Sequence, residues 1–191
     1  NYSRNRLMDL FFNYKRDINA IKGSFELTAG YNYQNLEYYG SGFSVNNAIV
    51  ANSAPYYNEL NLQSFFGRTN FDIANKYLFT FSVRADGSSL FREDDRWGIF
   101  PAAAFAWKIK DENFLNDVNF VNDLKVRLSV GKTGQQDITG NSGFYPSIPL
   151  FSIGSTTSQY LPGSNLYSAL PFNANLTWEK TTTYNAGLDF N

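Results

Sequence analysis

The chain alternates between apolar and polar residues at every second position, most regularly over residues 23–34. The apolar positions there are Phe25, Leu27, Ala29, Tyr31 and Tyr33, and the positions between them are polar or glycine. Successive side chains of a β-strand point to opposite faces, so the segment predicts a strand with one apolar and one polar face. Its length of about ten residues exceeds the usual strand of about 5–6 residues and matches the about 9–11 residues of a strand that crosses a bilayer.

The same alternation recurs along the chain and predicts about seven long strands and no long helix. The apolar positions of the other segments are Met8, Leu10, Phe12 and Tyr14; Phe65, Phe71 and Ile73; Tyr77, Phe79, Phe81, Val83 and Ala85; Ala103, Phe105, Trp107 and Ile109; Leu124, Val126, Leu128 and Val130; and Tyr184, Ala186, Leu188 and Phe190. Trp97 fits the rim of a barrel, where aromatic residues gather. Because proline cannot donate a ladder hydrogen bond, we expect Pro101 at the first residues of its strand or at a bulge.

The predicted connections differ in length between the two ends of the sheet. Residues 15–20, 74–76 and 110–123 form the shorter set, and residues 37–59, 87–96 and 133–175 form the longer set. Short turns at one end and long loops at the other are typical of outer-membrane barrels. The pattern therefore favours an all-β, antiparallel up-and-down transmembrane β-barrel over a soluble β-sandwich. The strands of a sandwich usually recur about every 8–12 residues.

Composition narrows the classes of function. The chain has 191 residues, enough for one ordinary domain, and its net charge of −1 gives no basic footprint for nucleic acid. It contains no cysteine and no histidine, which excludes disulfides, thiolate or imidazole metal sites, and Ser-His-Asp or Cys-His catalytic groups. A hydrolase that uses two carboxylates stays open, although Glu26, Asp72 and Asp86 cannot be paired from sequence. No apolar run approaches the roughly 18–20 residues of a transmembrane helix, and residues 1–6 do not resemble a signal peptide.

Three longer passages carry a more specific signal. Residues 75–89 read NKYLFTFSVRADGSS and continue to RWGIFPA at 96–102; residues 124–136 read LKVRLSVGKTGQQ; and residues 176–181 and 185–190 read LTWEKT and NAGLDF. Together, and in this order, these passages resemble the barrel of SusC/RagA-type TonB-dependent outer-membrane transporters of Bacteroidetes. The resemblance covers essentially the whole chain.

The resemblance implies that residues 1–191 are a partial β-barrel domain. Members of the family carry a signal peptide, a TonB box and a plug domain inside a barrel of about 22 strands. None of these elements is recognisable in the chain, and about seven strands cannot close such a barrel. No cofactor is implied. The carboxylates of Glu93, Asp94 and Asp95 could bind Ca²⁺, although a solvated loop tip is the expected state of such a run.

The resemblance also implies a function and partners. The function is active import of an oligosaccharide or oligopeptide across the outer membrane, without catalysis. The implied partners are a SusD-like surface lipoprotein that closes over the barrel as a lid, the TonB–ExbB–ExbD complex acting through the N-terminal region, and lipid or lipopolysaccharide around the barrel. The alternative is a surface glycan-binding protein or adhesin without transport.

Two sets of residues are candidates for functional contacts. Aromatic residues of the predicted long loops can stack on sugars or pack against the lid: Tyr38, Tyr39, Tyr56, Tyr57, Tyr145, Tyr160 and Tyr167. Charged residues of the polar parity are expected to face the lumen and the plug, where structural ion pairs are the default: Glu26, Arg68, Arg84, Asp86, Lys125 and Arg127.

Overall fold

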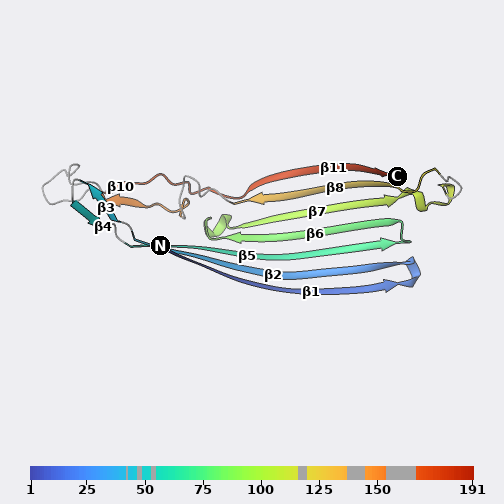
Figure 1. The fold of residues 1–191 in the computed structure, drawn as a ribbon, viewed down its shortest axis with the longest axis horizontal. Coiled ribbons are helices and arrows are strands. Elements are labelled where there is room, and N and C mark those ends of the chain that lie inside the picture. Colours follow the sequence, from blue (N-terminus) through green and yellow to red (C-terminus); the bar gives the residue numbers. More distant parts are fainter. Residues whose placement is uncertain (42, 47–48, 53–54, 116–119, 137–144, 154–166) are drawn as a thin grey trace.

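A computed structural model describes residues 1–41, 43–46, 49–52, 55–115, 120–136, 145–153 and 167–191. In these residues seven long strands form one antiparallel sheet in the order β1–β2–β5–β6–β7–β8–β11 (Figure 1). The strands are β1 (Tyr2–Ile18), β2 (Gly23–Gly40), β5 (Tyr56–Ile73), β6 (Tyr77–Ser88), β7 (Trp97–Lys108), β8 (Leu124–Gln135) and β11 (Glu179–Phe190). The all-β, up-and-down arrangement predicted from the alternation is confirmed.

The strands extend beyond the alternating segments. The expected long connection over residues 37–59 is wrong in its extent, because β2 continues to Gly40, β5 begins at Tyr56, and Tyr39 pairs with Tyr57. Two short hairpins were also missed: β3 (Phe43–Asn46) pairs with β4 (Ile49–Asn52), and β9 (Phe151–Ile153) pairs with β10 (Tyr167–Ala169). A ladder continues as long as the neighbouring backbone supplies hydrogen bonds, whether or not the side chains alternate.

The two ends of the sheet differ in their connections, as Figure 1 shows. The short-turn end holds the 3₁₀ turns η1 (Asn19–Ile21), η3 (Ile109–Asp111) and η4 (Asn113–Leu115) and the tight turn over residues 74–76. The long-loop end holds the two hairpins and η2 (Glu93–Asp95). Among the described residues, no helix is both long and apolar enough to cross a membrane.

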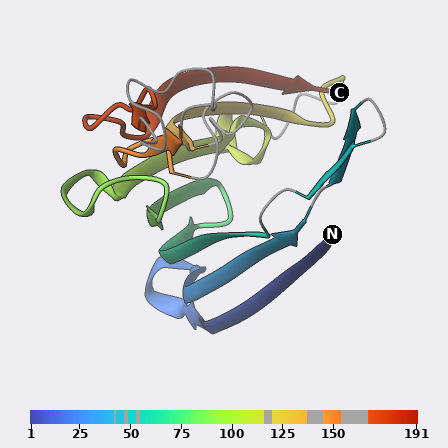
Figure 2. The same ribbon diagram turned by 90° about the vertical axis from the view of Figure 1, so that its left-hand side faces the viewer.

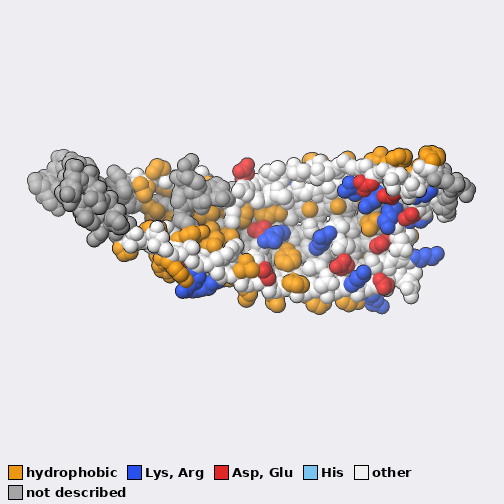
Figure 3. Space-filling model, in the orientation of Figure 1, with side chains coloured by type: hydrophobic (Ala, Val, Ile, Leu, Met, Phe, Trp, Pro, Cys, Tyr) orange, Lys and Arg blue, Asp and Glu red, His pale blue; other side chains and the backbone are white. Residues whose placement is uncertain are grey.

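The register brings the apolar positions of all seven strands to one face. Phe25 lies opposite Phe71, Phe71 opposite Phe79, and Phe79 opposite Phe105. The ring centroids are 5.0 Å apart for Phe25 and Phe71 and 4.9 Å apart for Phe79 and Phe105. The sheet is curved and forms an arc that is open on one side (Figure 2). Charged side chains gather over the strands on the concave face, which Figure 3 shows, so the apolar face is convex.

A small hydrophobic core lies on the concave face at the long-loop end. It consists of Leu60, Leu90, Phe91, Phe100 and Trp178. The ring of Trp178 lies 5.4 Å from that of Phe91 and 5.4 Å from that of Phe100, and its Nε1 donates to the carbonyl oxygen of Arg96 at 2.9 Å. The connection between β6 and β7 is therefore folded inward over the concave face rather than projecting from the rim.

The position of Pro101 in β7 differs from the one expected from the sequence. It lies opposite Val83 in an uninterrupted ladder with β6, neither among the first residues of the strand nor at a bulge. The ladder between β7 and β8 begins only at Ala102, so Pro101 borders the part of β7 that has a single paired neighbour. A strand position that lacks a partner on one side tolerates the missing N–H group.

Candidate functional site

The convex face carries an apolar band that two tryptophans of β7 delimit. Trp97 packs near Phe65 with ring centroids 6.0 Å apart, and Trp107 stacks on Tyr77 with centroids 6.3 Å apart. Both tryptophans share the convex parity and lie ten positions apart. Ten residues of strand rise about 33 Å, and a tilt of about 40° projects this onto about 25 Å. The apolar band of an outer-membrane barrel has this height.

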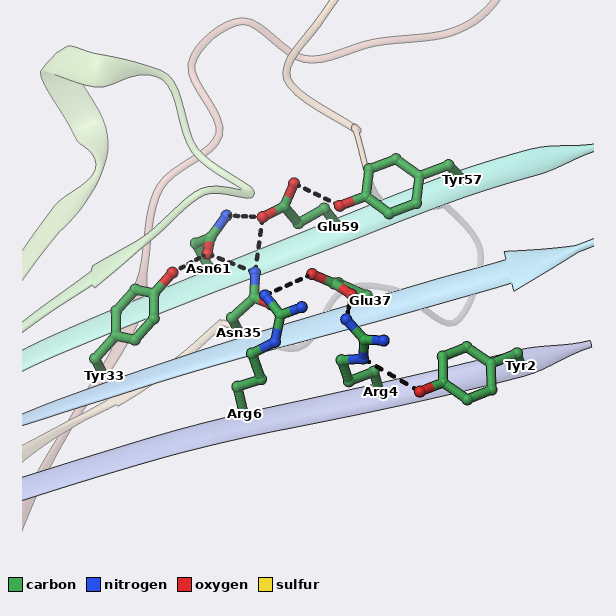
Figure 4. Close-up of polar contacts among 9 residues, drawn as sticks. All are labelled: Tyr2, Arg4, Arg6, Tyr33, Asn35, Glu37, Tyr57, Glu59 and Asn61. Carbon is green, nitrogen blue, oxygen red and sulfur yellow. Dashed lines mark hydrogen bonds and ion pairs between the residues drawn. The ribbon is translucent and has the colours of Figure 1, made fainter.

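Beyond the band, at the long-loop end, the convex face becomes polar (Figure 4). We call this region the convex polar cluster, and it comprises Tyr2, Arg4, Arg6, Tyr33, Asn35, Glu37, Tyr39, Tyr57, Glu59 and Asn61. The register places its members on shared rungs, because Arg4 lies opposite Glu37 and Glu37 lies opposite Glu59. The cluster has the same parity as Met8 and Leu10 of the band, so the same strand face changes from polar to apolar along its length.

A buried carboxylate lies at the centre of the cluster. Glu37 has a side chain that is 7% exposed, and its Oε1 lies 3.1 Å from Nη1 of Arg6. Its Oε2 lies 3.7 Å from Nη1 of Arg4 and has no hydrogen bond within the described part of the chain. The arginine side chains are 45% and 55% exposed, so the cations cover the anion and face the solvent. Arg4 is also oriented by Tyr2, whose hydroxyl accepts from Nε at 3.1 Å.

A network of amides and hydroxyls fixes the second carboxylate of the cluster. Asn35 donates from Nδ2 to Oε1 of Glu59 at 2.7 Å and to Oδ1 of Asn61 at 2.9 Å. Tyr33 donates its hydroxyl to Oδ1 of Asn61 at 2.8 Å, and Tyr57 donates its hydroxyl to Oε2 of Glu59 at 2.9 Å. The bonds from Asn61 and Tyr57 lower the pKa of Glu59, and the bond to Glu59 raises the pKa of Tyr57 to about 12. Glu59 therefore stays ionised and Tyr57 stays protonated at neutral pH.

The charged residues singled out in the sequence all lie on the concave face. They are Glu26, Arg68, Arg84, Asp86, Lys125 and Arg127. Arg84 forms an ion pair with Asp86 at 2.6 Å and donates from Nη2 to Oγ of Ser64 at 2.8 Å. Arg127 pairs across strands with Asp189 at 2.7 Å. The first pair lies within β6 and the second joins β8 to β11, and a role facing a lumen or plug stays a prediction.

Two further concave charges, Glu26 and Arg68, join a ladder of amide side chains. Oε1 of Glu26 accepts from Nδ2 of Asn13 at 3.1 Å, and Oε2 accepts from Nδ2 of Asn70 at 3.4 Å. Nε of Arg68 donates to Oδ1 of Asn70 at 3.3 Å. The polar residues of β1, β2 and β5 are therefore linked to one another across the wall.

The middle of the concave face over β7 and β8 is lined by short side chains, whereas Lys125 and Arg127 lie on the same face nearer the short-turn end. Ala102 lies opposite Gly131, and Ala104 lies opposite Ser129. Two neighbouring hollows of about 490 Å³ and about 380 Å³ lie there, and both are lined by Thr80, Ala104, Ser129 and Asn185 among others. A hollow of about 670 Å³ lies on the convex band, where Phe79, Phe81, Phe105, Leu128 and Tyr184 line it.

The candidate tyrosines do not form one set. Tyr38, Tyr39, Tyr56 and Tyr57 were expected in a loop and lie instead in the paired ends of β2 and β5. Tyr39 and Tyr57 belong to the convex polar cluster, whereas Tyr38 and Tyr56 have the opposite parity. The hydroxyl of Tyr145 accepts from the backbone nitrogen of Glu59 at 3.4 Å. Tyr167 begins β10, and Tyr160 lies outside the described residues.

The sequence interpretation missed the charged members of the cluster. Arg4, Arg6, Glu37 and Glu59 were not singled out, because strand prediction from apolar alternation stops where the apolar residues stop. The signal that could have found them is the continuation of the same parity from Met8 through Arg6 and Arg4. A period of two persists in a strand whatever the polarity of its residues.

In the described part of the chain, the acidic residues considered for a hydrolase or a Ca²⁺ site do not come together in one site. Glu26 faces Asn70, Asp72 faces Ser24 and Leu78, and Asp86 faces Ser64 and Gly98, so these three acids lie on separate rungs. The acids at Glu93–Asp95 form the turn η2. Within the ranges that the structure describes, no group of three or more acidic, cysteine or histidine side chains is placed to hold a metal ion.

Comparison with known proteins gives consistent matches along the chain. Residues 1–191 match the family model described as TonB dependent receptor-like, beta-barrel. The chain is 53% identical over 132 residues to the TonB-dependent receptor SusC of Bacteroides thetaiotaomicron, covering 68% of this chain and 13% of that protein. It is 33% identical over 201 residues to the TonB-dependent receptor P3 of Formosa agariphila, covering 97% of this chain and 19% of that protein.

The fold also matches a solved structure. A chain of the RagAB peptide transporter superposes with a TM-score of 0.81 at 23% identity, over 98% of this chain and 22% of that chain. The present chain therefore spans less than a quarter of the length of each protein to which it is similar here.

Proposed function

Because the chain belongs to the TonB-dependent receptor β-barrel family, we propose that it forms part of the wall of an outer-membrane transporter that imports a nutrient actively. The observation that carries this proposal is a convex apolar band about 25 Å tall on the same curved sheet as a polar concave face. In a closed barrel, the convex face contacts acyl chains and the concave face lines the lumen. The short-turn end then faces the periplasm and the long-loop end faces the cell exterior.

The proposal includes two protein partners. A SusD-like lipoprotein closes over the long-loop end, and the TonB–ExbB–ExbD complex acts through a plug and N-terminal region of the longer polypeptide. The similarity to SusC at 53% identity supports this assignment. Among the described residues, the exposed Tyr38 and Tyr56 at the long-loop end are in a position to contact the lid or the cargo. The cargo is an oligosaccharide or an oligopeptide.

The test uses the full-length protein that contains this chain. A strain that lacks the gene is complemented with the wild type or with a variant that lacks the TonB box, and uptake of labelled oligosaccharides and oligopeptides is measured. We expect uptake with the wild type and none with the variant. Immunoblotting of outer-membrane fractions serves as the control for equal insertion. Undiminished uptake by the variant contradicts active import.

One observation favours a second function, that of a surface glycan-binding protein without transport. Tyr2, Tyr39 and Tyr57 present exposed rings on the convex side, away from the concave face. A protein of this kind binds glycans without taking them up and folds as a soluble monomer. Purification of the full-length protein as a folded monomer without detergent favours this second function.

A further inference from the structure

The convex polar cluster is used neither by import through the lumen nor by a lid over the mouth. Met8, Tyr33 and Trp97 lie at the edge of the apolar band, and Tyr2 lies six positions beyond Met8 on the same face. Six residues of a strand tilted by about 40° rise about 15 Å along the membrane normal. Under the proposed orientation, on which this inference rests, the cluster lies at the depth of lipid headgroups and not of acyl chains.

The accessible charge of the cluster is positive although its formal charge is balanced. The carboxylate of Glu37 is almost fully buried beneath the half-exposed guanidinium groups of Arg4 and Arg6. Glu59, on the adjacent strand β5, accepts hydrogen bonds from the amides of Asn35 and Asn61 and from the hydroxyl of Tyr57. A ligand that approaches from the convex side therefore meets the cations first, so the cluster is complementary to an anion.

The two arginines are held in place while keeping hydrogen-bond capacity. Each guanidinium has five N–H donors, which exceed the contacts that Arg4 makes with Tyr2 and Glu37 and that Arg6 makes with Glu37. Arg4 lies 3.7 Å from the carboxylate, which is an ion-pair distance without a hydrogen bond. Planar guanidinium groups bind phosphate with two parallel hydrogen bonds, so a preorganised pair of this kind suits a phosphate group.

Three tyrosines form a shelf beside the arginines. The ring centroids of Tyr2 and Tyr39 are 6.0 Å apart, and those of Tyr39 and Tyr57 are 4.8 Å apart. The three residues are 54%, 42% and 45% exposed, so a part of each tyrosine is accessible from the convex side. An aromatic ring with a polar edge suits a ligand that is part apolar and part hydroxylated, as a sugar ring is.

We propose that the convex polar cluster binds the phosphorylated oligosaccharide headgroup of an outer-leaflet glycolipid. Arg4 and Arg6 bind the phosphate, and Tyr2, Tyr39 and Tyr57 pack against the sugar rings. Glu37 acts as the positioning residue that keeps the two guanidinium groups side by side. The apolar band below the cluster contacts the acyl chains of the same lipid, so one molecule extends along β1, β2 and β5.

The test measures glycolipid retained by the full-length transporter. The protein is reconstituted in phosphatidylethanolamine vesicles that contain lipopolysaccharide, either native or enzymatically dephosphorylated, then extracted, washed in detergent and assayed for bound sugar. We expect the wild type to retain native lipopolysaccharide and the Arg4→Gln/Arg6→Gln variant to retain less of it by roughly tenfold or more, the scale of a lost hydrogen bond to a charged group. Dephosphorylated lipopolysaccharide is expected to be retained as poorly by the wild type as the native form is by the variant.

Two further variants make the result unambiguous. Arg68→Gln/Arg84→Gln removes the same charge from the concave face and is expected to retain wild-type amounts of lipopolysaccharide. Arg4→Gln/Arg6→Gln/Glu37→Gln leaves no unpaired buried carboxylate and is expected to lose lipopolysaccharide like the double variant, even if the double variant folds poorly. Equal retention by wild type and the triple variant overturns the inference. Loss of a co-purifying protein in place of lipopolysaccharide overturns it in favour of a protein partner.

Uptake assays on strains that express the same variants separate this inference from the proposed function. If deletion of the TonB box leaves uptake intact while the retention of lipopolysaccharide still depends on Arg4 and Arg6, import fails and headgroup binding stands. If import depends on the TonB box but retention is the same in all variants, only the headgroup inference fails.

Discussion

Ala103 and Ala104 are adjacent residues of β7 whose side chains lie on opposite faces of the sheet. Ala103 lies on the convex band, opposite Phe81 and Val130. Ala104 lies on the concave face, opposite Thr80 and Ser129. The pair is close to the midpoint between Trp97 and Trp107. Substitutions at these two alanines therefore test the two faces at the same depth and from the same starting residue.

A positive charge at the two alanines is expected to have unequal costs. Ala103→Arg should lower the free energy of unfolding by about 2–4 kcal/mol, because the guanidinium would face hydrocarbon near the middle of the band. Ala104→Arg should change it by less than about 1 kcal/mol, because the concave face is polar. Urea-induced unfolding of the full-length protein in lipid vesicles measures both. Equal costs would show that the faces are assigned wrongly.

The inward-folded connection between β6 and β7 is expected to depend on Phe91. Phe91→Ala removes a buried ring from the contact with Trp178 and should cost about 3–5 kcal/mol, or release the connection locally. Limited proteolysis of intact cells, with cleavage mapped to residues 89–96, detects the release. Phe120→Ala is the control, since Phe120 is 81% exposed and its truncation should leave the cleavage pattern unchanged.

Two glycines are expected to differ in their tolerance of a methyl group. A Cβ on Gly98 would meet the ring of Phe100 and lie 2.9 Å from Cγ of Trp178, so Gly98→Ala should destabilise the barrel by about 1–3 kcal/mol through overpacking. A Cβ on Gly67 would have nothing within 4 Å, so Gly67→Ala should cause no loss. Thermal unfolding followed by electrophoretic mobility ranks the two variants, and a loss at Gly67 would contradict the packing described.

Stability at acidic pH is expected to depend on Glu112, in the connection between η3 and η4. Its Oε1 accepts from the hydroxyl of Tyr77 at 2.6 Å and from Nε1 of Trp107 at 3.1 Å, and its Oε2 lies 3.0 Å from Nζ of Lys76. The bond from Tyr77, followed by that from Lys76, lowers the pKa of Glu112 from 4.5 to about 2. A depressed pKa in the folded state means that the stabilisation is complete above the unfolded value and disappears as the pH falls through the folded value.

The wild type and Glu112→Gln are therefore compared over the acidic range. The difference in their free energies of unfolding should be constant above pH 4.5 and shrink as the pH falls toward about 2. Unfolding in urea at a series of pH values measures the difference. A gap that widens on acidification would show that the carboxylate is not held ionised by these contacts.

The sequence predicted the strands of the band because a period of two is a local property. Phe25 and Phe71 could each be assigned to an apolar face from their own segments, and the register then placed them opposite each other. The same rule failed at Glu37 and Glu59, where the strands leave the band. The outward face of the strands there carries polar side chains in place of apolar ones, so their sequence looks like a loop.

The core of the long-loop end could not have been predicted from local patterns. Leu90 and Ser147 belong to different connections, and they meet through a hydrogen bond from Oγ of Ser147 to the carbonyl oxygen of Leu90 at 2.8 Å. Such contacts join segments far apart in the chain and depend on the path of each loop. The position of Pro101 is of the same kind, since it depends on where β8 begins to pair with β7.

The short side chains of β7 and β8 have a consequence for the bore of the complete barrel. Where Ala102 and Ala104 face inward, the wall is hardly thicker than the backbone. Arg68 and Arg84 extend long side chains inward from β5 and β6, and Arg127 does so nearer the short-turn end of β8. At the level of the two alanines, the free passage is therefore expected to lie off the barrel axis, closer to β7 and β8. A plug segment that is withdrawn along this side would pass over methyl and hydroxymethyl groups, which offer few polar contacts and no long side chains.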